Sequence, residues 1–359
     1  MMKRLAGVLL VLMLVAAACG DDDGGDGDGL LKTITDRGNL ICGVNDAVPG
    51  FGFTDEAGQF SGFDVQYCRA VAAAVFGDYS KVEFVPLTAA QRFTSLQSGE
   101  IDVLIRNTTA TATRDGTEGA TFLTTTFYDG QGMMVRTGEF TSIDEMANAT
   151  ICVLTGTTTE LNLTARFAGV PFTASTFESN DPLREAFVSG QCDGWTSDKS
   201  QLAGVKSGVE EAGVPLTILD ETFSKEPLGP VVADGDSQWA QIVNWVVFAT
   251  IQAEEWGITS DNVQALASGG EAAIQAAIDA GELGGPNATT PNIAKFLGIG
   301  ETDPGLGLAT NFVVNVISQV GNYGQIYEAN VGVNTPLGLP RGANELWYKG
   351  GLLYAWPYR

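Results

Sequence analysis

Residues 101–115 read I-D-V-L-I-R-N-T-T-A-T-A-T-R-D and gather hydrogen-bonding side chains directly behind a short apolar run. The run at 101–105 has the length and the β-branched content of a buried strand. Asn107, Thr109 and Arg114 follow it. In open α/β sheets, ligands bind beyond the carboxyl ends of the strands, and a guanidinium grips a carboxylate through two parallel hydrogen bonds. The pattern predicts a carboxylate site, unless it is only a threonine-rich surface loop with a solvated arginine.

The residues around this segment alternate between strand-like and helix-like patterns. Short apolar runs at 40–44 and 82–86 predict strands, and apolar residues at helical spacing predict helices that begin with Asp64 as N-cap and at 89–98. A second series of the same kind starts with a strand predicted at 151–154. Repeated alternation of strands and helices indicates an α/β fold with parallel sheets flanked by helices.

The alternation breaks at 129–135 and at 225–230, where glycine or proline interrupts regular structure. We expect the chain to cross between two lobes at both places. Beyond the second break, helices are predicted from Asp236 onward and at 312–327. The predicted organisation is a signal peptide, a flexible linker, the first part of lobe 1, lobe 2, and a return to lobe 1 with a C-terminal helical extension, at residues 1–18, 19–29, 30–133, 134–226 and 227–359.

The first residues have the pattern of an export signal. Lys3 and Arg4 precede an apolar run at 5–18, which is too short to span a membrane, and small residues precede Cys19. This arrangement resembles a bacterial lipoprotein cleavage site, so Cys19 is predicted to carry a lipid, unless the chain is simply secreted. Residues 20–29 contain only Gly and Asp, which predicts a flexible tether to the membrane.

The composition excludes several classes of partner. Hydrophobic residues make up 44% of the chain and charged residues 17%, which is typical of a globular protein with a large core. The formal net charge of −24 argues against nucleic acid and anionic membrane surfaces as partners, because both would repel the chain.

The cysteines that follow Cys19 are even in number, as expected for disulfides in an exported protein: Cys42, Cys68, Cys152 and Cys192. Three pairings are possible. We favour Cys42–Cys68 and Cys152–Cys192, because each bond then stays inside one compact βα unit. Zinc is not expected, since the sequence has no histidine and no C-x-x-C spacing. Neither a metal nor a cofactor is predicted.

Several segments resemble amino-acid-binding proteins of bacterial ABC importers, in particular the general L-amino-acid-binding family. The matching segments lie at residues 42–45, 62–65, 67–74, 92–104, 106–109, 155–162, 224–230 and 321–324. The resemblance implies a two-lobed, periplasmic-binding-protein-like clamp (type II), in which each lobe is a mixed, mostly parallel sheet flanked by helices. It also implies an L-amino acid held between the lobes, delivery to an ABC permease with its ATPase, an extracytoplasmic location and a monomeric chain.

The resemblance also implies which residues hold the ligand carboxylate. Arg114 and Thr109 match the positions that bind it in the family. The loop at 155–158, with Thr157 and Thr158, contributes backbone N–H groups at a helix start, which suit an anion. The alternative for these two threonines is that they only cap their helix.

The other end of the ligand is assigned in the same way. Asp198 matches the acidic residue that accepts the ligand ammonium, with a helix cap as the alternative. Asn45 and Asn107 match polar positions near the ligand. Relatives often place a stacking aromatic in this region, where the present chain has Ala110, so the preferred amino acid stays open.

We predict a binding protein and not an enzyme. The alternative is an enzyme on the same fold, such as a small-acid dehydratase or a peptidoglycan lyase. Proton transfer would need a poised acid or base in the cleft, and the chain has no histidine. A sensory receptor is a third possibility, but no apolar stretch after the signal reaches membrane-spanning length.

Overall fold

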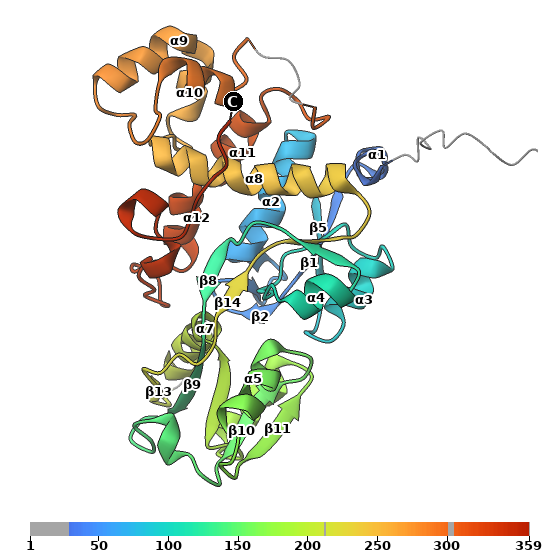
Figure 1. Ribbon diagram of the computed structural model, residues 1–359, viewed down its shortest axis with the longest axis vertical. Helices are drawn as coiled ribbons and strands as arrows, with labels where there is room; N and C mark the ends of the chain where they lie inside the picture. Colours follow the sequence, from blue (N-terminus) through green and yellow to red (C-terminus); the bar gives the residue numbers. More distant parts are fainter. Residues whose placement is uncertain (1–28, 212, 301–304, 359) are drawn as a thin grey trace, which may run out of the picture.

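The computed structural model describes residues 29–211, 213–300 and 305–358. The predicted signal peptide and Cys19 lie outside the described residues. The described chain forms two lobes, one around each of two five-stranded sheets (Figure 1). The expected α/β, two-lobed fold is confirmed.

The first lobe is built on a sheet with the order β5-β1-β6-β15-β7. Its strands are β1 (Leu40–Val44), β5 (Val82–Pro86), β6 (Val103–Leu104), β7 (Ala120–Phe122) and β15 (Val231–Ala233). β1 runs parallel to β5 and β6, whereas β15 is antiparallel to its neighbours. The helices in this part are α1 (Leu30–Arg37), α2 (Phe63–Phe76), α3 (Arg92–Gln97) and α4 (Ala112–Thr117), and a small antiparallel sheet joins β2 (Ala47–Val48), β3 (Gly52–Thr54) and β4 (Phe60–Ser61).

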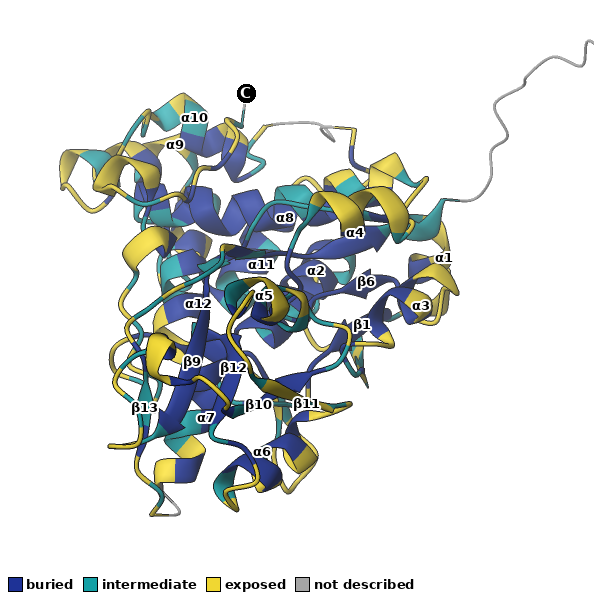
Figure 2. Ribbon diagram, turned by 60° about the horizontal axis from the view of Figure 1, so that its bottom comes forward, coloured by how far each residue is buried: buried dark blue, intermediate teal, exposed yellow. Residues whose placement is uncertain are grey.

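The second lobe has the order β11-β10-β12-β9-β13. Its elements are β9 (Gln131–Arg136), a short 3-10 helix (Ile143–Glu145), β10 (Thr150–Leu154), α5 (Thr158–Arg166), β11 (Thr173–Phe177), α6 (Asn180–Val188), β12 (Gly194–Asp198), α7 (Lys199–Glu211) and β13 (Leu216–Ile218). The inner strands are almost fully buried, whereas the edge strand β11 is largely exposed (Figure 2). The sheet is mixed because β9 is antiparallel to both of its neighbours.

Two short strands connect the lobes. β8 (Phe127–Asp129) and β14 (Glu226–Leu228) form an antiparallel pair outside both large sheets, with Asp129 opposite Glu226. The predicted border between residues 133 and 134 falls inside β9, which pairs only within the second sheet. The strand pairing therefore favours a first crossing near Gly130.

The C-terminal part adds helices to the first lobe. They are α8 (Ser237–Trp256), α9 (Val263–Asp279), α10 (Thr290–Phe296), α11 (Phe312–Val320) and α12 (Tyr323–Asn330), followed by 3-10 turns at Gly342–Asn344 and Trp347–Lys349. α8, α11 and α12 pack on α2, and their apolar side chains share one core with it. α9 and α10 lie at the end of the molecule opposite the second sheet (Figure 1).

Several predicted boundaries are wrong in detail. The helix expected at 312–327 is two helices, because Gly321 has a φ of 93° and Asn322 starts α12 with a capping box. The strand expected at 101–105 is only two residues long. Asp64 is not an N-cap, since α2 begins after Gly62 and the Asp64 carboxylate accepts the Asn107 N–H at 2.7 Å.

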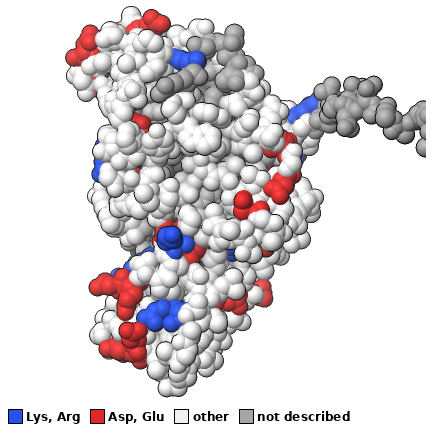
Figure 3. Space-filling model, viewed as in Figure 1, with Lys and Arg blue, Asp and Glu red and all other residues white. Residues whose placement is uncertain are grey.

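Both favoured disulfides are confirmed. Cys42–Cys68 joins β1 to α2, and Cys152–Cys192 joins β10 to the segment before β12. Within the described ranges, no helix has both the length and the apolar content needed to cross a bilayer. Figure 3 shows acidic side chains in separate small groups over the face drawn, so the negative charge of this face is not gathered in one patch.

Candidate ligand-binding site

Arg114 lies where the two lobes meet. We call this region the seam, and the Arg114 guanidinium contacts both lobes in it. It belongs to the short helix α4, whose N-cap Thr111 accepts the Arg114 N–H through its hydroxyl at 3.2 Å. The buried guanidinium donates from Nη1 to the Thr109 carbonyl at 3.0 Å and from Nη2 to the Gly156 carbonyl of the second lobe at 3.4 Å. The side chain also lies over the Phe93 ring, 5.6 Å from its centroid. The capped helix, the ring and the carbonyls fix the predicted carboxylate-binding group in place.

Two further guanidiniums lie in the same region. Arg92 on α3 donates to the Gly156 carbonyl at 3.3 Å, and Arg106 donates to the Leu87 carbonyl at 2.7 Å. Among the described residues, no carboxylate lies within ion-pair distance of Arg92, Arg106 or Arg114. Burial lowers the pKa of all three, to about 10 for Arg106. These three arginines form a buried cationic cluster, and within the described ranges none of them has an ion-pair partner.

Three carboxylates lie near the same seam. Asp198 ends β12, Asp129 ends β8, and Glu226 starts β14. Asp129 accepts the N–H groups of Gly130 at 2.7 Å and Ser200 at 3.2 Å. Burial raises the pKa of Asp129 to about 6. Burial, followed by the charges of Asp129 and Glu226, raises the pKa of Asp198 well above its usual range. Asp198 is therefore a carboxylate that a bound cation would stabilise in its charged form.

Some polar atoms of this seam have no hydrogen-bond partner in the described chain. They are Nε of Arg92, Oδ1 of Asp198 and Oε1 of Gln131, and all three are buried. A buried polar atom without a partner costs on the order of 1–3 kcal/mol. One donor lies on the first lobe and two acceptors lie on the second, so the seam can receive a polar molecule that has an anionic and a cationic end.

The two predicted threonines of the second lobe differ in what their hydroxyls do. Thr157 is the N-cap of α5, where its hydroxyl accepts the Glu160 N–H at 3.1 Å and donates to the Leu154 carbonyl at 2.7 Å. The Thr158 hydroxyl donates to Glu226 at 2.7 Å and lies 3.4 Å from the Thr109 hydroxyl. The structure thus brings Thr158 and Thr109 together across the seam, whereas the Thr157 hydroxyl is engaged within its own turn.

The predicted asparagines belong to a chain of amides that crosses the seam. Asn45 donates to Asn107 at 3.2 Å, Asn107 donates to Gln201 of α7 at 3.1 Å, and Gln201 donates to Asn180 at 2.8 Å. This chain of amides links the first lobe to the second through the Asn107–Gln201 hydrogen bond.

The region between the lobes also contains candidate site residues that the sequence analysis did not single out. Arg92 could have been found, since it lies four residues before Leu96 and therefore on the inner face of the same helix. Glu226, Gln131 and Gln201 carry no comparable signal, because their roles depend on contacts with residues far away in the sequence. Among the described residues, no group of three or more His, Cys, Asp or Glu side chains is placed to hold a metal ion.

Residues 40–332 match the family of bacterial extracellular solute-binding proteins, family 3. The chain belongs to this family. Among its relatives, the general L-amino acid-binding periplasmic protein AapJ of Rhizobium johnstonii is 44% identical, over 92% of each chain. The glutamate/glutamine/aspartate/asparagine-binding protein BztA of Rhodobacter capsulatus is 42% identical, over 92% of this chain and 93% of its own.

A solved structure supports the same assignment. It is an ABC transporter / periplasmic binding protein from Brucella ovis with glutathione bound. It is 42% identical, covers 92% of this chain and 99% of its own, and has a TM-score of 0.82. These relatives of the family 3 chain are named as binding proteins rather than enzymes.

Proposed function

We propose that this chain is an extracytoplasmic receptor that captures an L-amino acid between its lobes and delivers it to an ABC permease with its ATPase. The observation that carries this proposal is the pair of unpartnered buried atoms, Arg92 Nε on one lobe and Asp198 Oδ1 on the other. A free amino acid supplies a carboxylate and an ammonium, which are the two groups that these atoms lack. The names of AapJ and BztA support an amino acid as the ligand.

The ligand carboxylate is assigned to the first lobe. Arg114 and Arg92 supply guanidinium donors, which match a carboxylate in shape and charge. Thr109 supplies its hydroxyl, and Thr157 and Thr158 face it from the start of α5, where a helix N-terminus favours an anion.

The ligand ammonium is assigned to Asp198, whose free carboxylate oxygen faces no donor of the described chain. Binding of an ammonium would favour ionised Asp198 and lower its pKa toward the usual range. Asn45 and Asn107 are assigned to the ligand side chain, because they line the polar end of the seam beside Gln201.

Placing the two ends of the ligand on different lobes couples binding to closure. A ligand that contacts both lobes binds the closed state more tightly than the open one, and it therefore shifts the population toward closure. The β8–β14 pair is the proposed hinge. The permease then recognises the closed conformation.

The remaining assignments complete the proposal. Cys19 is the proposed lipid attachment site, and the Gly/Asp linker holds the receptor near the outer face of the membrane. The chain works as a monomer and releases its ligand chemically unchanged. The enzyme alternative has no observation in its favour, since the groups of the seam suit charge pairing.

Calorimetric titration of Arg114→Ala and Asp198→Ala tests the site. Removing one partner of a buried charge pair costs about 2–5 kcal/mol, so each variant should bind its best amino acid roughly 30-fold more weakly or worse. A thermal-shift screen over the amino acids first identifies that ligand, because a ligand at 100 times its Kd adds about 2.7 kcal/mol of stability.

Two controls make the test specific. The N-acetyl derivative of the same amino acid lacks the ammonium and should bind the wild type poorly. The assignment of Asp198 fails if Asp198→Ala binds the unmodified amino acid like the wild type. Formation of product over many turnovers, measured by chromatography of the ligand after incubation, would replace the receptor by an enzyme.

A further inference from the structure

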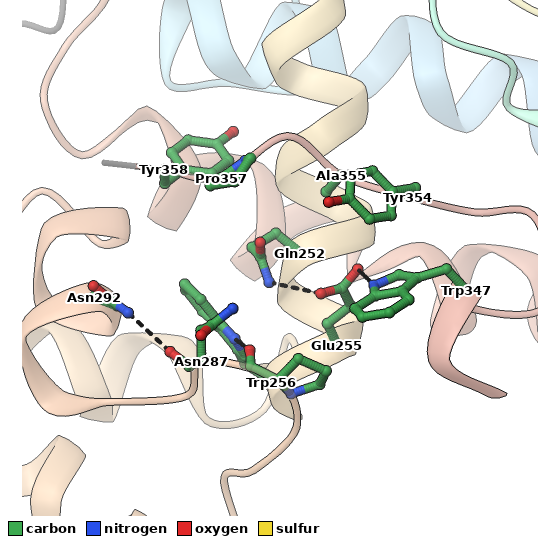
Figure 4. Close-up of a pocket in the computed structure, with 11 residues that line it drawn as sticks. Gln252, Glu255, Trp256, Asn287, Asn292, Trp347, Tyr354, Ala355, Pro357 and Tyr358 are labelled. Carbon is green, nitrogen blue, oxygen red and sulfur yellow. Dashed lines mark hydrogen bonds between the residues drawn. The ribbon is translucent and has the colours of Figure 1, made fainter.

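A cavity lies away from the seam, between the C-terminal end of α8 and the last residues of the described chain. It has a volume of about 340 Å³ and is lined by residues of α8, of the α9–α10 connection, of α10 and of the tail (Figure 4). Its lining side chains come from segments far apart in sequence, from Gln252 to Tyr358. The ligand proposed for the seam does not reach it, since α9 and α10 lie at the opposite end of the molecule from the second sheet (Figure 1).

Glu255 is the one charged side chain of this lining. It is only 6% exposed and accepts hydrogen bonds from Gln252 Nε2 and Trp347 Nε1, both at 3.2 Å. No Lys or Arg of the described chain pairs with it, and the nearby Arg341 is paired with Glu254 at 3.0 Å. Burial raises the pKa of Glu255. The cavity therefore holds a desolvated carboxylate that neutral donors orient and that has no counter-ion in the described residues.

Aromatic rings form much of the remaining wall. Trp256, Trp347, Tyr354 and Tyr358 line the cavity, and Trp347 and Tyr354 pack edge to face with their centroids 5.4 Å apart. The indole N–H groups are already used, by the Pro286 carbonyl for Trp256 at 2.8 Å and by Glu255 for Trp347. Figure 4 shows the Trp347 ring beside the Glu255 carboxylate and the Tyr354 ring close by. Ring faces carry negative potential and attract cations.

Two of these rings are unusually exposed for large aromatic residues. Trp347 is 43% exposed and Tyr354 is 53% exposed, although both lie at the cavity. An exposed aromatic wall beside a buried carboxylate suits one class of ligand. The negative charge of Glu255 would repel an anion, and a purely apolar molecule would leave that charge unpaired.

We propose that this cavity binds an organic cation of the alkylammonium class, with Glu255 as its counter-ion and the rings of Trp256, Trp347 and Tyr354 as its walls. The same chemistry is offered by a free small cation and by a lysine side chain of a peptide. The proposal is independent of the amino-acid site in the seam.

The test uses the full mature chain and choline as the quaternary ammonium probe. Proton–nitrogen NMR follows the indole N–H signals of the six tryptophans, with Trp256 and Trp347 assigned from their Phe variants. We expect saturable shifts of these two signals with a Kd of roughly 1 mM, as a few cation–π contacts and one carboxylate provide. 3,3-Dimethyl-1-butanol, the neutral counterpart of choline, should cause much smaller shifts.

Variants separate the parts of the cavity. Glu255→Gln keeps the size of the side chain and should weaken choline binding about tenfold. Tyr354→Leu removes an exposed ring and should weaken it severalfold without affecting the fold. Glu271→Gln, an exposed change on α9, is the matched control and should bind choline like the wild type.

Three outcomes would overturn the proposal: no saturable shift with choline up to about 50 mM, an equal response to the neutral alcohol, or unchanged binding in Glu255→Gln. Titration with Nα-acetyl-lysine amide separates the two sources. Tighter binding of this compound than of choline assigns the cavity to a lysine side chain, and the reverse order assigns it to a free cation. Retained amino-acid affinity in Glu255→Gln shows that the result is unrelated to the seam.

Discussion

The Nδ2 group of Asn107 in the first lobe donates a hydrogen bond to Oε1 of Gln201 in the second lobe at 3.1 Å. Asn107 occupies this position with a φ of 29°, in the left-handed region that asparagine tolerates better than most residues. The Asn107 N–H is held by the buried carboxylate of Asp64. The bond exists only while the two lobes are together, so it contributes to closure without touching either charged end of the proposed ligand.

Gln201→Ala should therefore weaken amino-acid binding about two- to tenfold. A single hydrogen bond between neutral groups contributes about 0.5–1.5 kcal/mol, which is much less than a buried charge pair. Calorimetric titration measures the change. Gln191→Ala, at an exposed residue of the same lobe, should bind like the wild type. Equal affinities of Gln201→Ala and the wild type would show that the bond does not contribute to the closed state.

Substitution of Gly204 on α7 by alanine should lower the affinity for the amino acid and raise the stability of the ligand-free chain. A Cβ atom at this position would meet the carbonyl oxygen of Pro49, which belongs to the first lobe, at 2.4 Å. Gly204→Ala should thus oppose full closure and lower amino-acid affinity tenfold or more. In an open chain the alanine meets no such contact, and it should stabilise the helix by up to about 1 kcal/mol.

Small-angle scattering and thermal unfolding check this pair of effects. The variant should show less compaction than the wild type at saturating ligand, and the ligand-free variant should melt at the same or a higher temperature. Gly208→Ala is the matched control, because a Cβ at Gly208 meets nothing within 4 Å. Normal affinity in Gly204→Ala would mean that the lobes do not approach this closely in solution.

Asp64 should make stability depend on pH. Burial raises its pKa from 3.8 to about 7, although the Asn107 N–H and Arg106 act in the opposite direction. The folded chain therefore binds a proton more tightly than the unfolded chain does. The resulting stabilisation is complete below about pH 4 and is lost as the pH rises through about 7.

Asp64→Asn should remove this dependence. Relative to the wild type, its free energy of unfolding should increase between about pH 4 and pH 7 and then level off. Urea unfolding at several pH values measures the difference. Glu56→Gln, at an exposed position, should run parallel to the wild type. A constant difference between Asp64→Asn and the wild type over this range would contradict the raised pKa.

Removal of the second disulfide should cost substantial stability. Cys152 and Cys192 are separated by 40 residues, and closing a loop of that length contributes on the order of 3–4 kcal/mol in the chain-entropy model. The Cys152→Ser/Cys192→Ser double variant should lose about this much free energy of unfolding in urea titrations. A loss below about 1 kcal/mol would show that the unfolded chain gains little freedom without the bond.

The parts of the fold that the sequence predicts best are those governed by local patterns. Strands at 40–44 and 82–86 and the cap of α8 at Asp236 follow from apolar runs and from one side-chain hydrogen bond. In the apolar run at 101–105, only Val103 and Leu104 pair with a neighbouring strand. Ile101 and Ile105 are buried without belonging to the strand. An apolar pattern reports burial more directly than it reports strand pairing.

The residues of the candidate site likewise divide into those that a local sequence pattern indicates and those that depend on contacts between distant residues. Arg114 and the hydroxyl-rich segment could be singled out from composition, since polar residues behind a strand are a local feature. Glu226 could not, because its partners Thr158 and Asn162 lie more than 60 residues away and are brought to it only by the β8–β14 pair. The aromatic cavity is hidden for the same reason, as α8 and the tail meet only in three dimensions.

Each disulfide among the described residues lies within one lobe. Cys42–Cys68 braces the first lobe and Cys152–Cys192 braces the second, and neither spans β8 and β14, the proposed hinge strands. Covalent stiffening is thus confined to the two lobes, and among the described residues no disulfide crosses the proposed hinge between them. An oxidising environment therefore stabilises each lobe and leaves the proposed hinge without a covalent constraint.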